Sequence, residues 1–164
     1  MKIIKYFIVN FLSLSFIINE MTAIIVNEIK EIVNRETQGW NNQDLDLLMS
    51  IFHPDMVWPS PRTSQSHDPE NWIFELGRFD NERWRNNWRN LFDKYYLVHN
   101  NRIIKKIVIS NEGDGAFAVV DVDTLWRNKK DGKDFHWYGR ACKIYTKLKN
   151  GQWKMIAHTG LLKY

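Results

Sequence analysis

The segment AVVDVDTLWRNKKDGKDFHWYGRACKIY, residues 118 to 145, decides the fold. Two β-branched and aromatic runs flank an Asp-Gly turn signal, which predicts an antiparallel hairpin. Asp121 and Asp123 are two positions apart in the first run, so both side chains lie on one face of the strand. Two carboxylates in an otherwise apolar strand raise the question of whether this face forms a functional site.

Two further strand-like segments flank this hairpin, RIIKKIVIS at 102–110 and QWKMIAHTGLL at 152–162. The connections EGDG and KNGQ contain Gly with Asp or Asn, the residues that favour tight turns between antiparallel strands. The last third of the chain is therefore predicted to be a curved meander of four antiparallel strands.

Helices are predicted before the sheet. Residues 22–38 have apolar residues at helical spacing, with Thr22 as N-cap and Gly39 as a stop signal. A short helix is predicted within 42–52, and a third helix follows Asp80. Trp84 and Trp88 lie on the apolar stripe of this third helix, so it packs against the sheet. The sequence therefore predicts the α+β class.

Length, charge and cysteine content exclude several classes of function. The chain has 164 residues, 23 Lys and Arg against 19 Asp and Glu, eight Trp and one cysteine. This length predicts one domain, and one cysteine excludes an intramolecular disulfide framework. The arginines near Trp84 and Trp88 fall outside the apolar stripe, which favours a solvated basic face over a nucleic-acid site. No phosphate-binding motif and no metal-binding spacing is present, so we expect no cofactor and no metal.

The first 21 residues are expected to be a signal peptide or an upstream extension, with the folded domain at 22–164. Their apolar run is short for a membrane span, so no membrane partner is predicted. The expected location is cytoplasmic, or exported if residues 1–23 act as a signal peptide.

Counting residue pairs back from the predicted turn shows which side chains of the two strands share a face. A two-residue turn at Asp131-Gly132 places Asp123 opposite Arg140, whereas a four-residue loop places Asp121 there. In both registers His136 and Tyr138 join the carboxylates, and the Asn150-Gly151 turn adds Met155. We expect this face to meet the helices and to line a pocket that binds a small apolar or aromatic molecule.

The predicted site has two groups of residues. The catalytic candidates are Asp121, Asp123 and Arg140; the ligand-binding candidates are Trp58, Trp88, His136, Tyr138 and Met155. Repulsion between the carboxylates would raise the pKa of one of them, and Arg140 would hold the other ionised.

The opposite face carries Val120, Val122, Trp126, Trp137 and Tyr145. These side chains are too apolar for water, so this outer face is expected to form a homodimer interface. By the same count, Lys143 and His158 lie on this side and outside the pocket.

The order of elements, with FHPDMVW at 52–58 and NGQWKMIAH at 150–158, resembles the nuclear transport factor 2-like superfamily in its SnoaL-like branch. The resemblance covers about 22–164 and implies a cone-shaped curved antiparallel sheet wrapped around N-terminal helices, with a deep pocket and commonly a homodimer. Its members include polyketide cyclases, ketosteroid isomerases, dehydratases, epoxide hydrolases and non-catalytic association domains. Many have histidines four and six residues after the closing Trp, where this chain has Ala157 and Thr159.

Three functions are compatible with these residues: proton-transfer catalysis (isomerisation, dehydration, cyclisation or hydrolysis), ligand binding without turnover, and a structural or association role. In the last case Asp121 or Asp123 would form only a cross-strand ion pair with Arg140.

Overall fold

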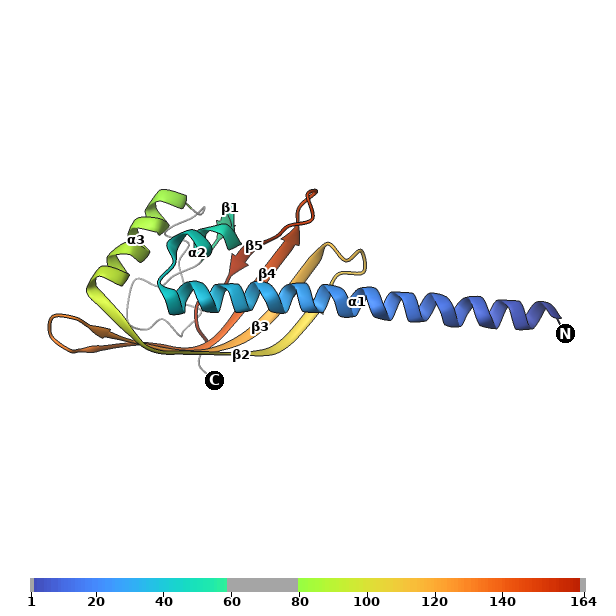
Figure 1. Ribbon diagram of the computed structural model, residues 1–164, viewed down its shortest axis with the longest axis horizontal. Coiled ribbons are helices and arrows are strands. Elements are labelled where there is room, and N and C mark those ends of the chain that lie inside the picture. Colours follow the sequence, from blue (N-terminus) through green and yellow to red (C-terminus); the bar gives the residue numbers. More distant parts are fainter. Residues whose placement is uncertain (1, 59–79, 163–164) are drawn as a thin grey trace.

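A five-stranded curved sheet carries three helices on one face (Figure 1). The structure is a computed structural model that describes residues 2–58 and 80–162, with side chains from residue 20 onward. The helices are α1 (Lys2–Asn42), α2 (Leu45–Ile51) and α3 (Asn81–Lys94). The strands are β1 (Phe52–Val57), β2 (Tyr95–Ile109), β3 (Gly115–Asn128), β4 (Asp134–Lys147) and β5 (Trp153–His158). The predicted α+β class is confirmed.

The strand order is β1-β5-β4-β3-β2. The four strands from β2 to β5 form the predicted antiparallel meander, whereas β1 pairs with β5 in parallel, so the sheet is mixed. The β3–β4 pairing matches the longer of the two predicted loops, with Asp121 opposite Arg140 and Asp123 opposite Tyr138.

Helix α1 differs from the prediction at both ends. It runs without a break from Lys2 to Asn42, so Thr22 lies inside it and is not its N-cap. Gly39 also lies inside the helix and is buried against Leu48 of α2; a Cβ at Gly39 would lie 2.8 Å from the Leu48 side chain. This glycine therefore permits close packing of α1 against α2 rather than stopping α1.

Figure 1 shows α1 extending well beyond the sheet toward the N-terminus. The assignment of 1–21 as a separate upstream segment stays a prediction. Within the part of the chain that is described, no helix combines the length and the apolar composition needed to cross a membrane.

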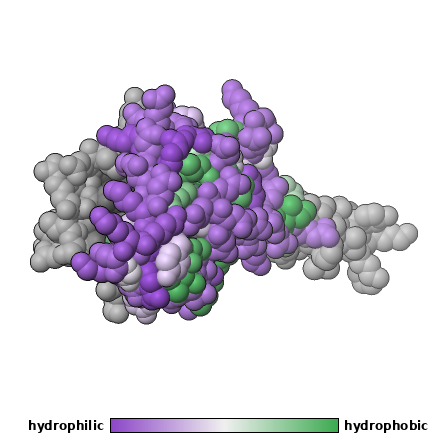
Figure 2. Space-filling model, turned by 60° about the vertical axis from the view of Figure 1, so that its left-hand side comes forward, coloured by the Kyte–Doolittle hydropathy of each residue, from purple (hydrophilic) through white to green (hydrophobic). Residues whose placement is uncertain are grey.

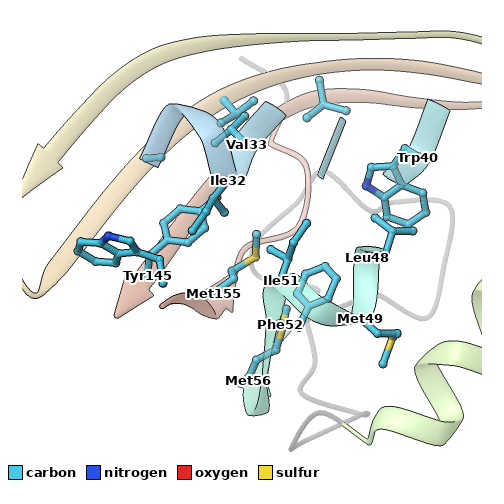
Figure 3. Packing of buried hydrophobic residues seen from close by; sticks show 14 of the residues in the cluster. Ile32, Val33, Trp40, Leu48, Met49, Ile51, Phe52, Met56, Tyr145 and Met155 are labelled. Atoms are coloured by element: carbon cyan, nitrogen blue, oxygen red, sulfur yellow. The ribbon is translucent and has the colours of Figure 1, made fainter. Parts of the chain in front are cut away.

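The hydrophobic core lies between the helices and one face of the sheet. Figure 3 shows Ile32 and Val33 of α1, Ile51 of α2, Phe52 of β1 and Met155 of β5 in this core. Strand β3 contributes the even-numbered side chains, which are buried: Ala116, Ala118, Val120, Val122, Thr124 and Trp126. The face that carries Val120 therefore meets the helices, and the face that carries Asp121 is the outer face.

This orientation is the reverse of the predicted one. The residues that share a face with Asp121 in β3 and β4 are as predicted, but that face does not meet the helices. Val120, Val122, Trp126 and Tyr145 are core residues, so they cannot form the predicted dimer interface. The physical reason is that helix docking buries the face with the longer unbroken apolar run, and on β3 that is the even-numbered face.

The β4–β5 register contains a second difference. A β-bulge lies between Ile144 and Tyr145, and it pairs Met155 with Tyr145 on the inner face. On the other side of the bulge, Lys143 pairs with His158, as predicted. Both side chains are buried on the face that meets the helices, whereas the prediction placed them on the outer face. A bulge adds one residue to one strand and so reverses which side chains share a face across it.

Candidate functional site

An ionic cluster lies inside the core, between α1 and the sheet. Its centre is Glu36, which is 1% exposed and follows Ile29, Ile32 and Val33 along the buried stripe of α1. Arg102 Nη1 of β2 donates a hydrogen bond to Glu36 Oε1 at 2.6 Å, and Lys143 Nζ of β4 donates to Glu36 Oε2. Three elements far apart in sequence thus bring one carboxylate and two cations together.

The charges within this cluster determine its protonation. Burial alone would raise the pKa of Glu36, but Lys143 and Arg102 outweigh burial and hold that pKa well below its usual range. Burial lowers the pKa of Lys143 to about 8, against the opposing charge of Glu36. Near neutral pH, Glu36 is ionised and Lys143 is an ammonium group that can lose its proton at little cost.

His158 ends β5 beside this cluster. Its Nδ1 bonds to the carbonyl oxygen of Thr159, and since a carbonyl only accepts, Nδ1 carries the proton. Burial, reinforced by the charge of Lys143, lowers the pKa of His158 to about 3. The ring is therefore neutral near pH 7, with Nε2 as its unprotonated nitrogen.

Two buried polar atoms among the described residues have no hydrogen-bond partner, the Tyr145 hydroxyl and Trp126 Nε1. Tyr145 is 1% exposed and follows Lys143 on the inner face of β4. Burial and the charge of Glu36 raise the pKa of Tyr145 well above its usual value, so its hydroxyl stays a neutral donor. A buried donor without an acceptor costs about 1–3 kcal/mol, which a bound acceptor would recover.

Aromatic rings surround the polar groups. Trp40 donates from Nε1 to Glu36 Oε1 at 3.3 Å, and its ring lies 5.1 Å from that of Trp88. Trp58 stacks on His158 at 4.1 Å and on Trp84 at 4.9 Å. The surroundings of the ionic cluster are therefore apolar and aromatic.

The structure divides the predicted site residues between the two faces of the sheet. Trp58, Trp88 and Met155 lie on the inner side with the ionic cluster. Five others lie on the outer face, so their predicted position in a pocket between sheet and helices is wrong: Asp121, Asp123, Arg140, His136 and Tyr138. Their roles in binding or catalysis stay predictions.

Both outer carboxylates have cationic or imidazole partners of their own. Arg140 donates to Asp121 from Nε at 2.6 Å and from Nη2 at 3.2 Å, and this pairing lowers the pKa of Asp121. Asp123 accepts from His136 and His99, which lowers its pKa as well. The predicted raised pKa is therefore wrong, because each carboxylate faces its own partners rather than the other carboxylate.

Sequence reasoning missed Glu36, Arg102, Lys143, His158 and Tyr145. One signal was available: Glu36 is an ionisable residue within the apolar stripe of a helix, where it needs a buried partner. Lys143 likewise alternates with Ala141 and Tyr145, which are both buried.

The order of elements, the curved sheet and the helices on one face define the nuclear transport factor 2-like fold, and comparison with solved structures agrees. The chain is similar to a nuclear transport factor 2-like protein from Salmonella enterica, with 19% identity over 87% of this chain and 94% of that one, at a TM-score of 0.61. It is also similar to a ketosteroid isomerase-like protein from Erwinia carotovora, with 14% identity over 80% and 91% of the chains and a TM-score of 0.62.

A third similar structure is a hexachlorocyclohexane dehydrochlorinase, with 14% identity over 89% of this chain and 90% of that one, at a TM-score of 0.62. No protein-family model and no curated protein sequence matches the chain. The fold predicted from the resemblance is confirmed; at these identities the similarity concerns the fold alone.

Proposed function

We propose that the protein binds a small, mainly apolar molecule between the sheet and the helices and performs proton transfer on it. The observation that carries this proposal is the buried ionic cluster beside the unpartnered Tyr145 hydroxyl. Buried ionisable groups with displaced pKa values gather at functional sites more often than elsewhere. The aromatic surroundings suit an apolar ligand, and Tyr145 and Lys143 suit one oxygen atom on it.

The proposed roles follow from protonation. Isomerisation, dehydration, cyclisation and hydrolysis all place negative charge on an oxygen at some step, and two donors aimed at that oxygen would stabilise it. Tyr145 is a neutral donor, and Lys143, with a pKa of about 8, can give up and regain a proton near neutral pH. Glu36 holds Lys143 in place and stays ionised.

His158 can accept a hydrogen bond through Nε2 in this proposal. Asp121, Asp123 and Arg140 lie on the other face of the sheet, so the proposed chemistry does not use them. Among the structures of the same fold, the dehydrochlorinase has an apolar substrate by name, which is compatible with an apolar site.

The test is a ligand screen of the full chain by thermal shift and native mass spectrometry, with small carbonyl, lactone, steroid-like and aromatic acid compounds. The Tyr145→Phe variant removes only the unpartnered hydroxyl. Tyr138→Phe on the outer face is the matched control, since Tyr138 is 52% exposed. A ligand at the proposed site should raise the Tm of the wild type and of Tyr138→Phe, and much less that of Tyr145→Phe.

Without ligand, Tyr145→Phe should be at least as stable as the wild type, because the lost hydroxyl satisfies no partner in the protein. A hit that shifts the Tm of Tyr145→Phe as strongly as that of the wild type would contradict the proposed site. A compound that binds at this site without reacting would support the proposed binding site and contradict the proposed proton transfer on that compound.

The second candidate function is association without catalysis, and the exposed apolar residues of the outer face favour it. Ile103 is 60% exposed, and Val108, Tyr138 and Ile144 are between 43% and 52% exposed on the same face. The side of the molecule shown in Figure 2 is mostly hydrophilic and carries smaller apolar patches. We propose that a homodimer, if it forms, uses this face.

Light scattering of the wild type beside Ile103→Lys tests this alternative. A dimer that dissociates on introduction of the lysine would support it, since a charge buried at an interface is costly. A wild-type monomer at high concentration would exclude it.

A further inference from the structure

Three metal-ligating side chains meet on the outer face of the sheet, away from the ionic cluster. They are His99 of β2, Asp123 of β3 and His136 of β4, from three adjacent strands. His99 and His136 both pair with Leu125 of β3, one from each side, and Asp123 is two residues away on the same face. The two imidazoles therefore flank the carboxylate.

A β-bulge makes this arrangement. The β2–β3 register shifts between Leu97 and His99, where Leu97 pairs with Trp126 and His99 pairs with Leu125. Without the extra residue, His99 would pair with Thr124 and point into the core. The bulge turns the His99 ring outward to Asp123, and bulges often redirect a side chain in this way at functional sites.

The ligand atoms converge closely. His99 Nε2 lies 2.9 Å and His136 Nε2 lies 2.7 Å from the same oxygen, Asp123 Oδ1. All three ligand atoms lie within 4.8 Å of one another, and no other described residues form such a group of three. The side chains are 36%, 39% and 47% exposed, so an ion can reach them from solvent.

We propose that His99, Asp123 and His136 bind a divalent transition-metal ion of the zinc class. Two ligands at about 2.0–2.1 Å from a tetrahedral zinc ion lie about 3.3 Å apart. The contacts to Asp123 need to widen by only a few tenths of an ångström to reach this separation, while the ion replaces the protons of two hydrogen bonds.

The donor set selects the ion. Two imidazole nitrogens and one carboxylate oxygen favour Zn²⁺, Ni²⁺ or Cu²⁺ over Mg²⁺ and Ca²⁺, which prefer oxygen ligands throughout. Three protein ligands leave the fourth position of a tetrahedral zinc ion to water, which is the arrangement of catalytic rather than structural zinc sites. Because the ligands lie on three adjacent hydrogen-bonded strands, the sheet fixes the relative positions of their backbones.

The test is calorimetric titration of the untagged full chain with Zn²⁺ after removal of metal by a chelator. We expect one ion per chain. Single His99→Ala and His136→Ala variants should weaken binding at least about 100-fold, since even changes around metal ligands cost 10–100-fold. His53→Ala on β1 is the matched control and should bind like the wild type.

Co²⁺ gives a second measurement, because its visible absorption distinguishes four-coordinate from six-coordinate sites. Asp123→Asn keeps the size of the side chain and removes one charged ligand, so it tests the site even if a histidine variant folds poorly. Circular dichroism establishes which variants are folded. Wild-type binding that is absent, or binding that survives in folded His136→Ala and Asp123→Asn, would overturn the proposal.

Discussion

Removing the central carboxylate of the ionic cluster should destabilise the protein strongly. Glu36→Gln preserves the shape of the side chain but leaves Lys143 and Arg102 as buried cations without a counter-charge. Breaking a buried ion pair from one side costs about 3–5 kcal/mol. We therefore expect the free energy of unfolding to fall by about this amount near pH 7.

The control is Glu28→Gln, two turns earlier on α1. Glu28 accepts from Lys147 at 2.8 Å, but this pair is about one-third exposed. A partly solvated pair contributes at most about 1 kcal/mol, so Glu28→Gln should cost far less than Glu36→Gln. The assay is urea unfolding followed by tryptophan fluorescence, with a check that the m-value is unchanged.

The destabilisation should also shrink at higher pH. In wild type, the pKa of Lys143 is lowered to about 8, so the folded protein releases this proton before the unfolded chain, and stability rises above about pH 8. Without Glu36 this pKa falls further, so the gain starts lower. Between pH 7 and pH 9 the variant therefore gains more stability from the loss of this proton than the wild type does.

The difference in the free energy of unfolding between variant and wild type should therefore narrow from pH 7 to pH 9. A cost for Glu36→Gln below about 1 kcal/mol, or no larger than that of Glu28→Gln, would refute the argument that these charges depend on one another.

Gly39→Ala should cost about 1–3 kcal/mol in urea unfolding, because the new Cβ would lie 2.8 Å from Leu48 and must separate α1 from α2; no loss would contradict this packing. Gly139→Ala should loosen the contact of β4 with Leu162, because Gly139 has a φ of 147° and a Cβ there would lie 2.6 Å from the Leu162 carbonyl oxygen. Hydrogen exchange at Arg140 and Leu162 measures the loosening, and unchanged exchange would argue against it. Asp121→Asn should change stability by less than about 1 kcal/mol near neutral pH, because its pair with Arg140 is about one-third exposed. Because the pKa of Asp121 is lowered in the folded protein, this small stabilisation is present above the usual pKa of an aspartate and is lost as the pH falls through the folded-state pKa. Thermal melting at a series of acid pH values measures this stabilisation, and a large loss of stability in Asp121→Asn at neutral pH would contradict the prediction.

Local sequence signals determined the elements and much of their pairing. Alternation in β3 and β4 and the turn chemistry between them predicted which side chains share a face, and one of the two predicted registers is the observed one. These features depend on residues close in sequence, because side chains alternate with period two and tight turns fix register.

Tertiary packing decided which face meets the helices. Alternation defines two faces but not which one is covered, and the aspartates drew attention to the outer one. The even-numbered residues from Ala116 to Val122 are all apolar and were the better guide to the buried face, because burial follows apolar area.

The two candidate sites also depended on tertiary structure. Glu36 and Lys143 are 107 residues apart, and each would be too costly to bury without the other, so neither alone predicts the pair. His99 reaches Asp123 only because a bulge shifts one strand by one residue. The sequence by itself therefore determined the fold class and limited the central hairpin to two registers, whereas the positions of the charges depended on helix docking and bulges, which bring together residues far apart in sequence.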